Sequence, residues 1–104
     1  MKRLIFMALA VFIATCAPHP PTETEKNLAQ AYLNQGRIYA VNGQHDKAIS
    51  DCSTAIEINP RYAEAYLNQE RIYAVKGHYD RAIADYNKAI EINFSGTALP
   101  MTRY

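Results

Sequence analysis

The sequence has little of what a disulfide framework, a metal centre or a nucleic-acid surface requires. Its 104 residues include two cysteines, four glycines and no tryptophan. Two cysteines cannot build a disulfide framework, and three scattered histidines with no cysteine or carboxylate at ligand spacing predict no metal site. The net charge of +1 offers no electrostatic footprint for nucleic acid. The length allows one small domain at most.

Catalytic motifs are scarce as well. No glycine-rich phosphate loop follows a strand, and no strand pattern is convincing, so no cofactor is expected. The stretch "QHDKAISDCS" brings His45, Asp46 and Cys52 close together in the sequence. A turn that leads into a helix explains each of these residues, and Cys52 falls on an apolar helical stripe as a small core residue rather than a reactive thiol. We therefore expect a protein that is not an enzyme.

The first residues have the order of a secretory signal peptide. Lys2 and Arg3 precede an apolar run from Leu4 to Ala14, and small residues follow up to Cys16. The run would make about 16 Å of helix, roughly half of a bilayer core, so we do not expect it to span a membrane. Residues 1–15 are interpreted as a cleaved signal peptide.

The end of this segment, "IATC", resembles the lipobox of bacterial lipoproteins, in which the cysteine is lipidated and becomes the new N-terminus. This resemblance implies a lipid anchor on Cys16 and a location in the bacterial cell envelope. Ordinary secretion to give a soluble periplasmic or secreted protein is the alternative, followed by an accidental apolar start. Residues 16–25 hold three prolines among small and polar residues, which predicts a semi-extended tether.

From about Lys26 the pattern becomes helical. One apolar helical face ends at Asn42–Gly43, and a second runs from Ala48 to Ile56 and ends at Asn59–Pro60. The whole pattern then recurs 34 residues later, with 21 identities between residues 29–62 and 63–96. A period of this length with a helix–turn–helix in each copy predicts an α-helical solenoid.

The repeated residues resemble those of the tetratricopeptide repeat (TPR) family. The family positions in the first copy are Tyr32, Gln35, Gly36, Tyr39, Ala48, Cys52, Ala55 and Pro60. Those in the second copy are Tyr66, Gln69, Glu70, Tyr73, Ala82, Tyr86, Ala89 and Phe94. The resemblance implies an all-α fold of two tandem units, TPR 1 over residues 26–62 and TPR 2 over residues 63–94. The tyrosines are expected to be core residues rather than a platform for nucleic acid.

Three departures from the family pattern fall mainly in the second copy. Both copies carry glutamine where the family prefers leucine. Glu70 replaces the small residue at the point where the two helices of a repeat approach most closely, and Phe94 replaces the proline. Residues 95–104 show no helical period and are expected to form an irregular tail. Two repeats are also near the lower limit for burying a core, which favours self-association, a covering partner or marginal order.

In the family, the first helices of successive repeats line a concave groove that binds a peptide or a partner helix. The resemblance places the following residues in this groove: Leu33, Asn34, Arg37, Ala40, Val41, Leu67, Asn68, Arg71, Ala74 and Val75. The two sets are identical in residue type, which reflects either a shared binding function or recent duplication. Asparagine can pair with a peptide backbone, and arginine can bind a carboxylate through two hydrogen bonds.

These features together predict a protein-interaction module or scaffold of the bacterial envelope that binds a protein or peptide. The membrane would be reached through the anchor on Cys16. The alternative is a self-associating structural subunit, a homo-oligomer, or an accessory subunit of an envelope complex.

Overall fold

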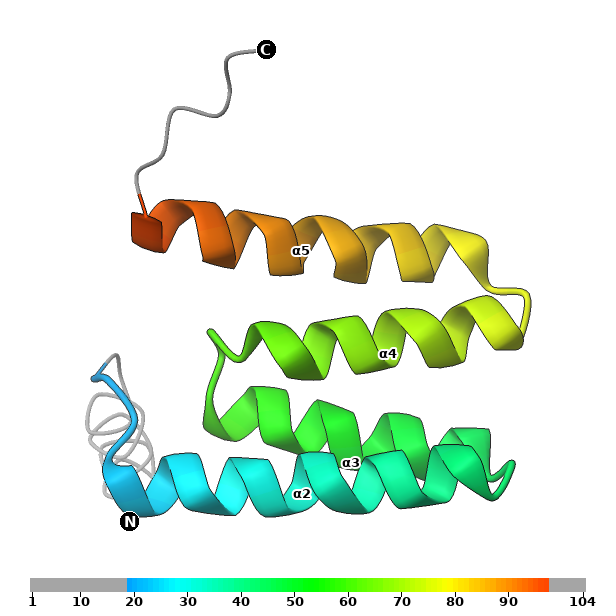
Figure 1. Cartoon of the computed structure of the whole chain (residues 1–104), viewed down its shortest axis with the longest axis horizontal. Coiled ribbons are helices and arrows are strands. Elements are labelled where there is room, and N and C mark those ends of the chain that lie inside the picture. Colours follow the sequence, from blue (N-terminus) through cyan, green and yellow to red (C-terminus); the bar gives the residue numbers. More distant parts are fainter. Residues whose placement is uncertain (1–18, 98–104) are drawn as a thin grey trace, which may run out of the picture.

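A computed structural model describes residues 19–97 of the chain, and within them the fold is all-α, as predicted. The four helices are α2 (Glu23–Val41), α3 (His45–Ile58), α4 (Ala63–Val75) and α5 (Tyr79–Thr97). They form two antiparallel hairpins that stack in chain order, with α2 and α5 at the two ends of the stack (Figure 1). The predicted signal peptide, Cys16 and residues 98–104 lie outside the described residues.

The first helix begins earlier than we expected from the sequence. Thr22 caps it: its hydroxyl accepts a hydrogen bond from the Glu25 N–H at 3.2 Å, and the Glu25 carboxylate accepts one from the Thr22 N–H at 2.9 Å. This reciprocal pair is a capping box, for which threonine followed three residues later by glutamate is the sequence signature. Residues 23–25 therefore belong to α2 rather than to the tether.

The turn inside each hairpin is formed in the same way. Gly43 and Gly77 have φ angles of 82° and 83°, which residues other than glycine rarely adopt. The residue after each glycine donates its N–H back into the preceding helix, Gln44 to the Tyr39 carbonyl at 2.9 Å and His78 to the Tyr73 carbonyl at 2.8 Å. The glycine stop signals thus end α2 and α4 where the sequence predicted.

The end of the second repeat differs from the end of the first. α3 ends at Ile58, just before Asn59–Pro60, and a tight turn leads to α4. Phe94 stands in place of Pro60 in the second copy, so no proline stops the helix there. α5 continues to Thr97, and the expectation of an irregular tail from residue 95 is wrong for residues 95–97.

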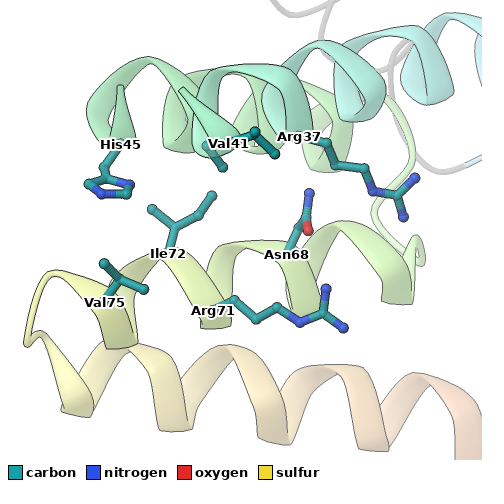
Figure 2. Close-up of a pocket in the computed structure, with 8 residues that line it drawn as sticks. Arg37, Val41, His45, Asn68, Arg71, Ile72 and Val75 are labelled. Atoms are coloured by element: carbon teal, nitrogen blue, oxygen red, sulfur yellow. The ribbon is translucent and has the colours of Figure 1, made fainter. Parts of the chain in front are cut away.

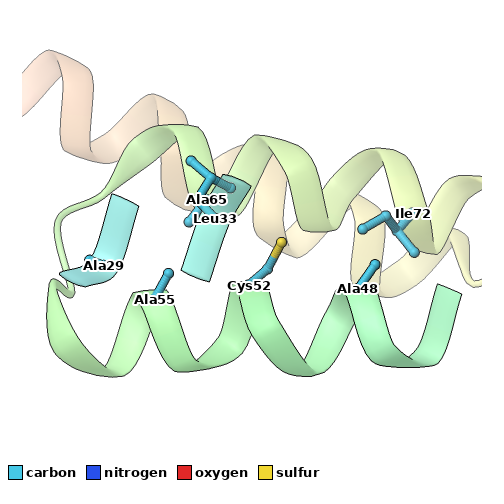
Figure 3. Packing of buried hydrophobic residues seen from close by; sticks show 7 residues of the cluster. All are labelled: Ala29, Leu33, Ala48, Cys52, Ala55, Ala65 and Ile72. Atoms are coloured by element: carbon cyan, nitrogen blue, oxygen red, sulfur yellow. The ribbon is translucent and has the colours of Figure 1, made fainter. Parts of the chain in front are cut away.

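The core lies where the two hairpins meet. Small residues dominate it, and Figure 3 shows α2, α3 and α4 contributing to one buried cluster. Its members are Ala29, Leu33, Ala48, Cys52, Ala55, Ala65 and Ile72. Cys52 is completely buried, which confirms its interpretation as a core residue, and this burial raises the pKa of its thiol to about 11. A thiol so protonated is a poor nucleophile at neutral pH.

Two hydrogen-bonded side chains join α4 to α3. The Gln69 amide donates to the Ser53 hydroxyl at 2.6 Å and to the Ile49 carbonyl at 3.3 Å. The neighbouring Asn68 amide donates to the Cys52 sulfur at 3.8 Å. Both side chains are buried, and these bonds offset the loss of hydration that burial of an amide entails. The glutamine at the family's leucine position therefore connects the repeats.

Gly36 marks the closest approach of the helices in the first repeat, as predicted. A Cβ atom at this position would lie 3.1 Å from the Cys52 sulfur and 3.2 Å from the Ala48 carbonyl oxygen. In the second repeat Glu70 takes this place and lines a concavity with Ala82. The Glu70 carboxylate repels the carboxylate of Asp85, which is the counterpart of Asp51.

Not all the tyrosines are in the core. The tyrosines at residues 32, 39, 66 and 73 are partly buried, in agreement with the sequence analysis. Tyr79 and Tyr86 are 65% and 50% exposed because, among the described helices, only α4 packs on α5. The expectation that these two belong to the core is wrong.

We predict that Asp85 makes the protein less stable at neutral pH than in mild acid. Burial, and secondly repulsion by Glu70, raise the pKa of Asp85 to about 6 from 3.8. The folded state therefore holds the Asp85 proton more tightly than the unfolded state does. Protonation of Asp85 stabilises the fold fully below about pH 4, and this stabilisation is lost as the pH rises through 6. Asp85→Asn should raise the free energy of unfolding by about 1 kcal/mol at pH 7 and by little at pH 4.

Urea unfolding at both pH values tests this prediction, with Asp51→Asn as the matched control. Asp51 faces Gly36 instead of a carboxylate, so its substitution should change the pH profile less. Equal effects of the two substitutions at both pH values would contradict the role of the Glu70–Asp85 pair.

Candidate functional site

A groove of about 380 Å³ lies between α2 and α4. Its residues come from α2, from the first turn of α3 and from α4: Arg37, Ala40, Val41, His45, Asn68, Arg71, Ile72 and Val75. Figure 2 shows the side chains of Arg37 and Arg71 extending toward the same end of the groove, whereas Val75 and His45 lie at the other end. The stacking of two hairpins thus brings together residues that are one repeat apart in the sequence.

The groove has exposed apolar side chains. Val41 is 86% exposed and Val75 is 69% exposed. Ile72 also borders the groove but is almost completely buried. Two exposed valines in one groove leave apolar surface that a partner's side chains can cover.

Arg37 and Arg71 give positive charge to the end of the groove toward which their side chains extend. The Arg37 guanidinium lies 3.8 Å from the Glu64 carboxylate and donates to the side-chain Oδ1 of Asn34 at 3.5 Å, and both of its partners are exposed. Exposed ion pairs of this kind contribute little to stability, so the guanidinium can exchange Glu64 for another carboxylate at small cost. Arg71 is exposed, and within residues 19–97 no ion pair engages it.

The structure brings together six of the ten residues predicted to line the groove. Arg37, Val41, Asn68, Arg71 and Val75 line the same groove. Ala40 also lines it, whereas Ala74 lines the concavity beside Glu70.

The other three predicted residues lie elsewhere. Asn34 is exposed next to Arg37, and Leu67 is partly buried outside the lining. Leu33 is completely buried in the core, so its side chain cannot line a groove. The expectation for Leu33 is corrected because α2 turns this residue toward α3 and α4.

The two identical sets of residues have different environments. Asn68 is 8% exposed and donates to the Cys52 sulfur, whereas its counterpart Asn34 is exposed. The cause is position in the stack, since α4 packs between α3 and α5, whereas among the described helices α2 packs mainly on α3. The sequence analysis placed both asparagines in the groove, and only Asn68 lines it.

His45 and Ile72 belong to the groove but were missed from the sequence. The His45 Nδ1 atom is buried, and within the described part of the chain it has no hydrogen-bond partner. Its position at the start of α3, directly after the turn that brings α3 back along α2, was the available signal. Ile72 follows Arg71 directly and is not one of the family's groove positions, so the family pattern did not predict its place in the lining.

Among residues 19–97, no three histidine, cysteine, aspartate or glutamate side chains cluster as a metal ion would require. None of the helices described is both long enough and apolar enough to cross a bilayer.

Comparisons with known proteins agree with this architecture. The tetratricopeptide repeat model matches residues 26–62, and a second model of the same repeat matches residues 63–95. The crystal structure of MamA is similar to the chain with a TM-score of 0.66 and 34% sequence identity. The similarity covers 68% of this chain and 42% of the MamA chain. No curated protein sequence matches the chain. The chain belongs to the tetratricopeptide repeat family, whose repeats form protein–protein interaction modules.

Proposed function

We propose that this protein captures a peptide or a segment of a partner protein in the groove between α2 and α4. The observation that carries the proposal is the pairing of exposed apolar surface, Val41 and Val75, with two guanidinium groups, Arg37 and Arg71, in one groove. An exposed apolar concavity with a few convergent polar groups is typical of a binding site. Capture is the whole mechanism in this proposal, and the protein carries out no reaction.

The lining indicates the chemistry of the ligand. A carboxylate, from an acidic side chain or a chain terminus, can accept hydrogen bonds from a guanidinium, and two arginines at one end of the groove would hold it firmly. An aliphatic or aromatic side chain next to this carboxylate would cover the valines. The Asn68 amide already donates one hydrogen to Cys52, so its remaining polar atoms are available for the ligand backbone. The preferred ligand is therefore an acidic segment with an apolar anchor.

We also propose that the protein acts in the bacterial cell envelope, where a lipid on Cys16 holds it at a membrane. The support is the "IATC" sequence after an apolar segment with a basic start. Acyl chains contribute about 0.8 kcal/mol per buried methylene group, so several chains on one cysteine anchor a protein stably. The repeats would then present their groove to other envelope proteins from the end of a short tether.

A display library of random peptides tests the groove. We expect the selected peptides to combine an acidic residue or a free terminal carboxylate with an apolar residue. Arg37→Ala together with Arg71→Ala should weaken their binding by about 10- to 100-fold, because each arginine provides charge-assisted hydrogen bonds. Titration of a fluorescent selected peptide against both proteins measures the change.

Arg81→Ala is the matched control for this titration. Arg81 is an exposed arginine on α5, over the Tyr73 ring and outside the groove, so its removal should leave the affinity unchanged. Circular dichroism checks that all variants keep their helices. An affinity that is equal in the Arg37/Arg71 variant and in the wild type would contradict the proposed groove.

The anchor has its own test, which uses the two cysteines of the chain as a matched pair. Cells that express the full-length chain are supplied with a clickable fatty acid. Wild type and Cys52→Ser should both become labelled, because Cys52 is buried in the repeat core, and Cys16→Ser should lose at least about 90% of the label. Equal labelling of Cys16→Ser and wild type would rule out the anchor and leave ordinary secretion.

A further inference from the structure

The outer face of α2 carries residues that the same sequence buries elsewhere in the molecule. α4 packs against α3 through Ala65, Asn68, Gln69 and Ile72, whose exposed fractions are 0%, 8%, 6% and 3%. Their counterparts 34 residues earlier are identical in type. All four counterparts are exposed on α2, and they are Ala31, Asn34, Gln35 and Ile38. The exposed fraction of Ile38 is 62%.

The outer face of α5 repeats the surface on α3 that receives α4. Ile49 and Ile56 are partly buried beside the core cluster, and their counterparts on α5 are again isoleucines, Ile83 and Ile90. Ile83 is 58% exposed, because none of the described helices packs on α5 as α4 packs on α3. The chain therefore exposes one half of its internal junction at each end.

A concavity on the α5 side indicates what is missing there. Ile72 of the second repeat lies above Ala48 of the first repeat in the core cluster, as Figure 3 shows, and Ile72 is 3% exposed. In the second repeat the counterpart Ala82 lines an open concavity of about 310 Å³, together with Glu70, Ala74, Tyr79, Ile83 and Tyr86. The residue that corresponds to Ile72 and could fill this space is Ile38 of another chain.

We infer that a second copy of this chain docks its α2 on α5 of the first copy, in the way that α4 docks on α3 within one chain. The internal α3–α4 junction would then continue from chain to chain. Donor and acceptor surfaces differ in this arrangement, so the contact is head-to-tail and does not close on itself, and it would build an open, superhelical row of copies.

The lengths of the end helices fit this arrangement. α2 begins at Glu23, whereas α4 begins at Ala63, the counterpart of Ala29. α5 ends at Thr97, whereas α3 ends at Ile58, the counterpart of Ile92. Neighbouring helices in the stack are antiparallel, so the extra turns at the start of α2 and at the end of α5 would lie side by side. No connecting turn is needed between separate chains, and both helices can be longer there.

The new junction would differ from the internal one in two polar details. Lys76 pairs with Asp46 at 2.9 Å inside the chain, and the corresponding residues between chains are Asn42 and Asp80. An asparagine can still donate a hydrogen bond to this aspartate. Tyr86 replaces Cys52, which gives α5 a larger apolar surface than α3 has. Each docking would also place Arg37 of one copy near Arg71 of the next and so extend the proposed groove.

Complementary variants test the head-to-tail contact in the full-length chain by sedimentation velocity. Wild type should form species larger than a monomer in proportions that rise with concentration. Ile38→Arg blocks the α2 face and Ile83→Arg blocks the α5 face, so each variant alone should associate at least about tenfold more weakly. An equimolar mixture of the two variants should restore association and stop at a dimer, because one intact face of each kind remains.

Two controls exclude other modes of association. The double variant Ile38→Arg/Ile83→Arg keeps the apolar N-terminal segment and should not pair with either single variant. Gln30→Arg places the same charge on α2 outside the groove, at a position whose counterpart, Glu64, keeps a side chain that is 64% exposed beside the internal junction, so it should associate as wild type does. A wild-type chain that stays monomeric at high concentration would overturn the inference, as would one single variant that still dimerises alone.

Cross-linking gives a readout that does not depend on the tolerance of an arginine. Gln69 and Ser53 meet at 2.6 Å in the internal junction, and their counterparts are Gln35 and Asn87. In a Cys16→Ser background, a mixture of Gln35→Cys and Asn87→Cys chains should form dimers with a short thiol cross-linker at least about tenfold more than either chain alone. Equal cross-linking in the mixture and in the separate chains would reject the proposed contact.

Discussion

The fold depends on the junction between α3 and α4. Each hairpin is too small to bury its own apolar face, and the junction covers the exposed side of the first repeat with the first helix of the second. Apolar burial of Ala65 and Ile72 supplies the driving force, and Gln69 fixes the register through its bonds to Ser53 and Ile49. The groove is a consequence of this register, because Arg37 and Arg71 come together only when α2 and α4 lie side by side (Figure 2).

The fold could be predicted from the sequence because its signals are local and occur twice. The period of the repeat, the glycines at Gly43 and Gly77 and the close contact at Gly36 follow from backbone conformation and from the space between two helices. Thr22 and Glu25 also have the sequence signature of a capping box at the start of α2. The three prolines before them favoured an extended tether, and the predicted helix therefore began too late. The extension of α5 follows from the loss of a proline, a weaker signal than its presence.

The environment of individual residues was harder to predict, and the reason is physical. Asn34 and Asn68 are the same residue at the same position of one repeat, yet only Asn68 is covered. A short stack has two end helices for two inner ones, so end effects decide half of its surfaces. The tyrosines of α5 were misplaced for the same reason, since a family pattern describes a repeat with neighbours on both sides. Leu33 was misplaced for another reason, because α2 turns it into the core toward α3 and α4. The exposed ends are also the surfaces through which we infer that copies associate.

The role of the α3–α4 junction can be tested most directly with two glutamines that differ only in their neighbours. In dilute protein, Gln69→Ala should lower the free energy of unfolding by about 1–3 kcal/mol, because it removes two hydrogen bonds and leaves the partly buried Ser53 hydroxyl without its partner. Gln35→Ala, at the same position of the exposed α2 face, should change it by less than about 0.5 kcal/mol. Equal effects of the two substitutions in urea unfolding would contradict the central place of this junction.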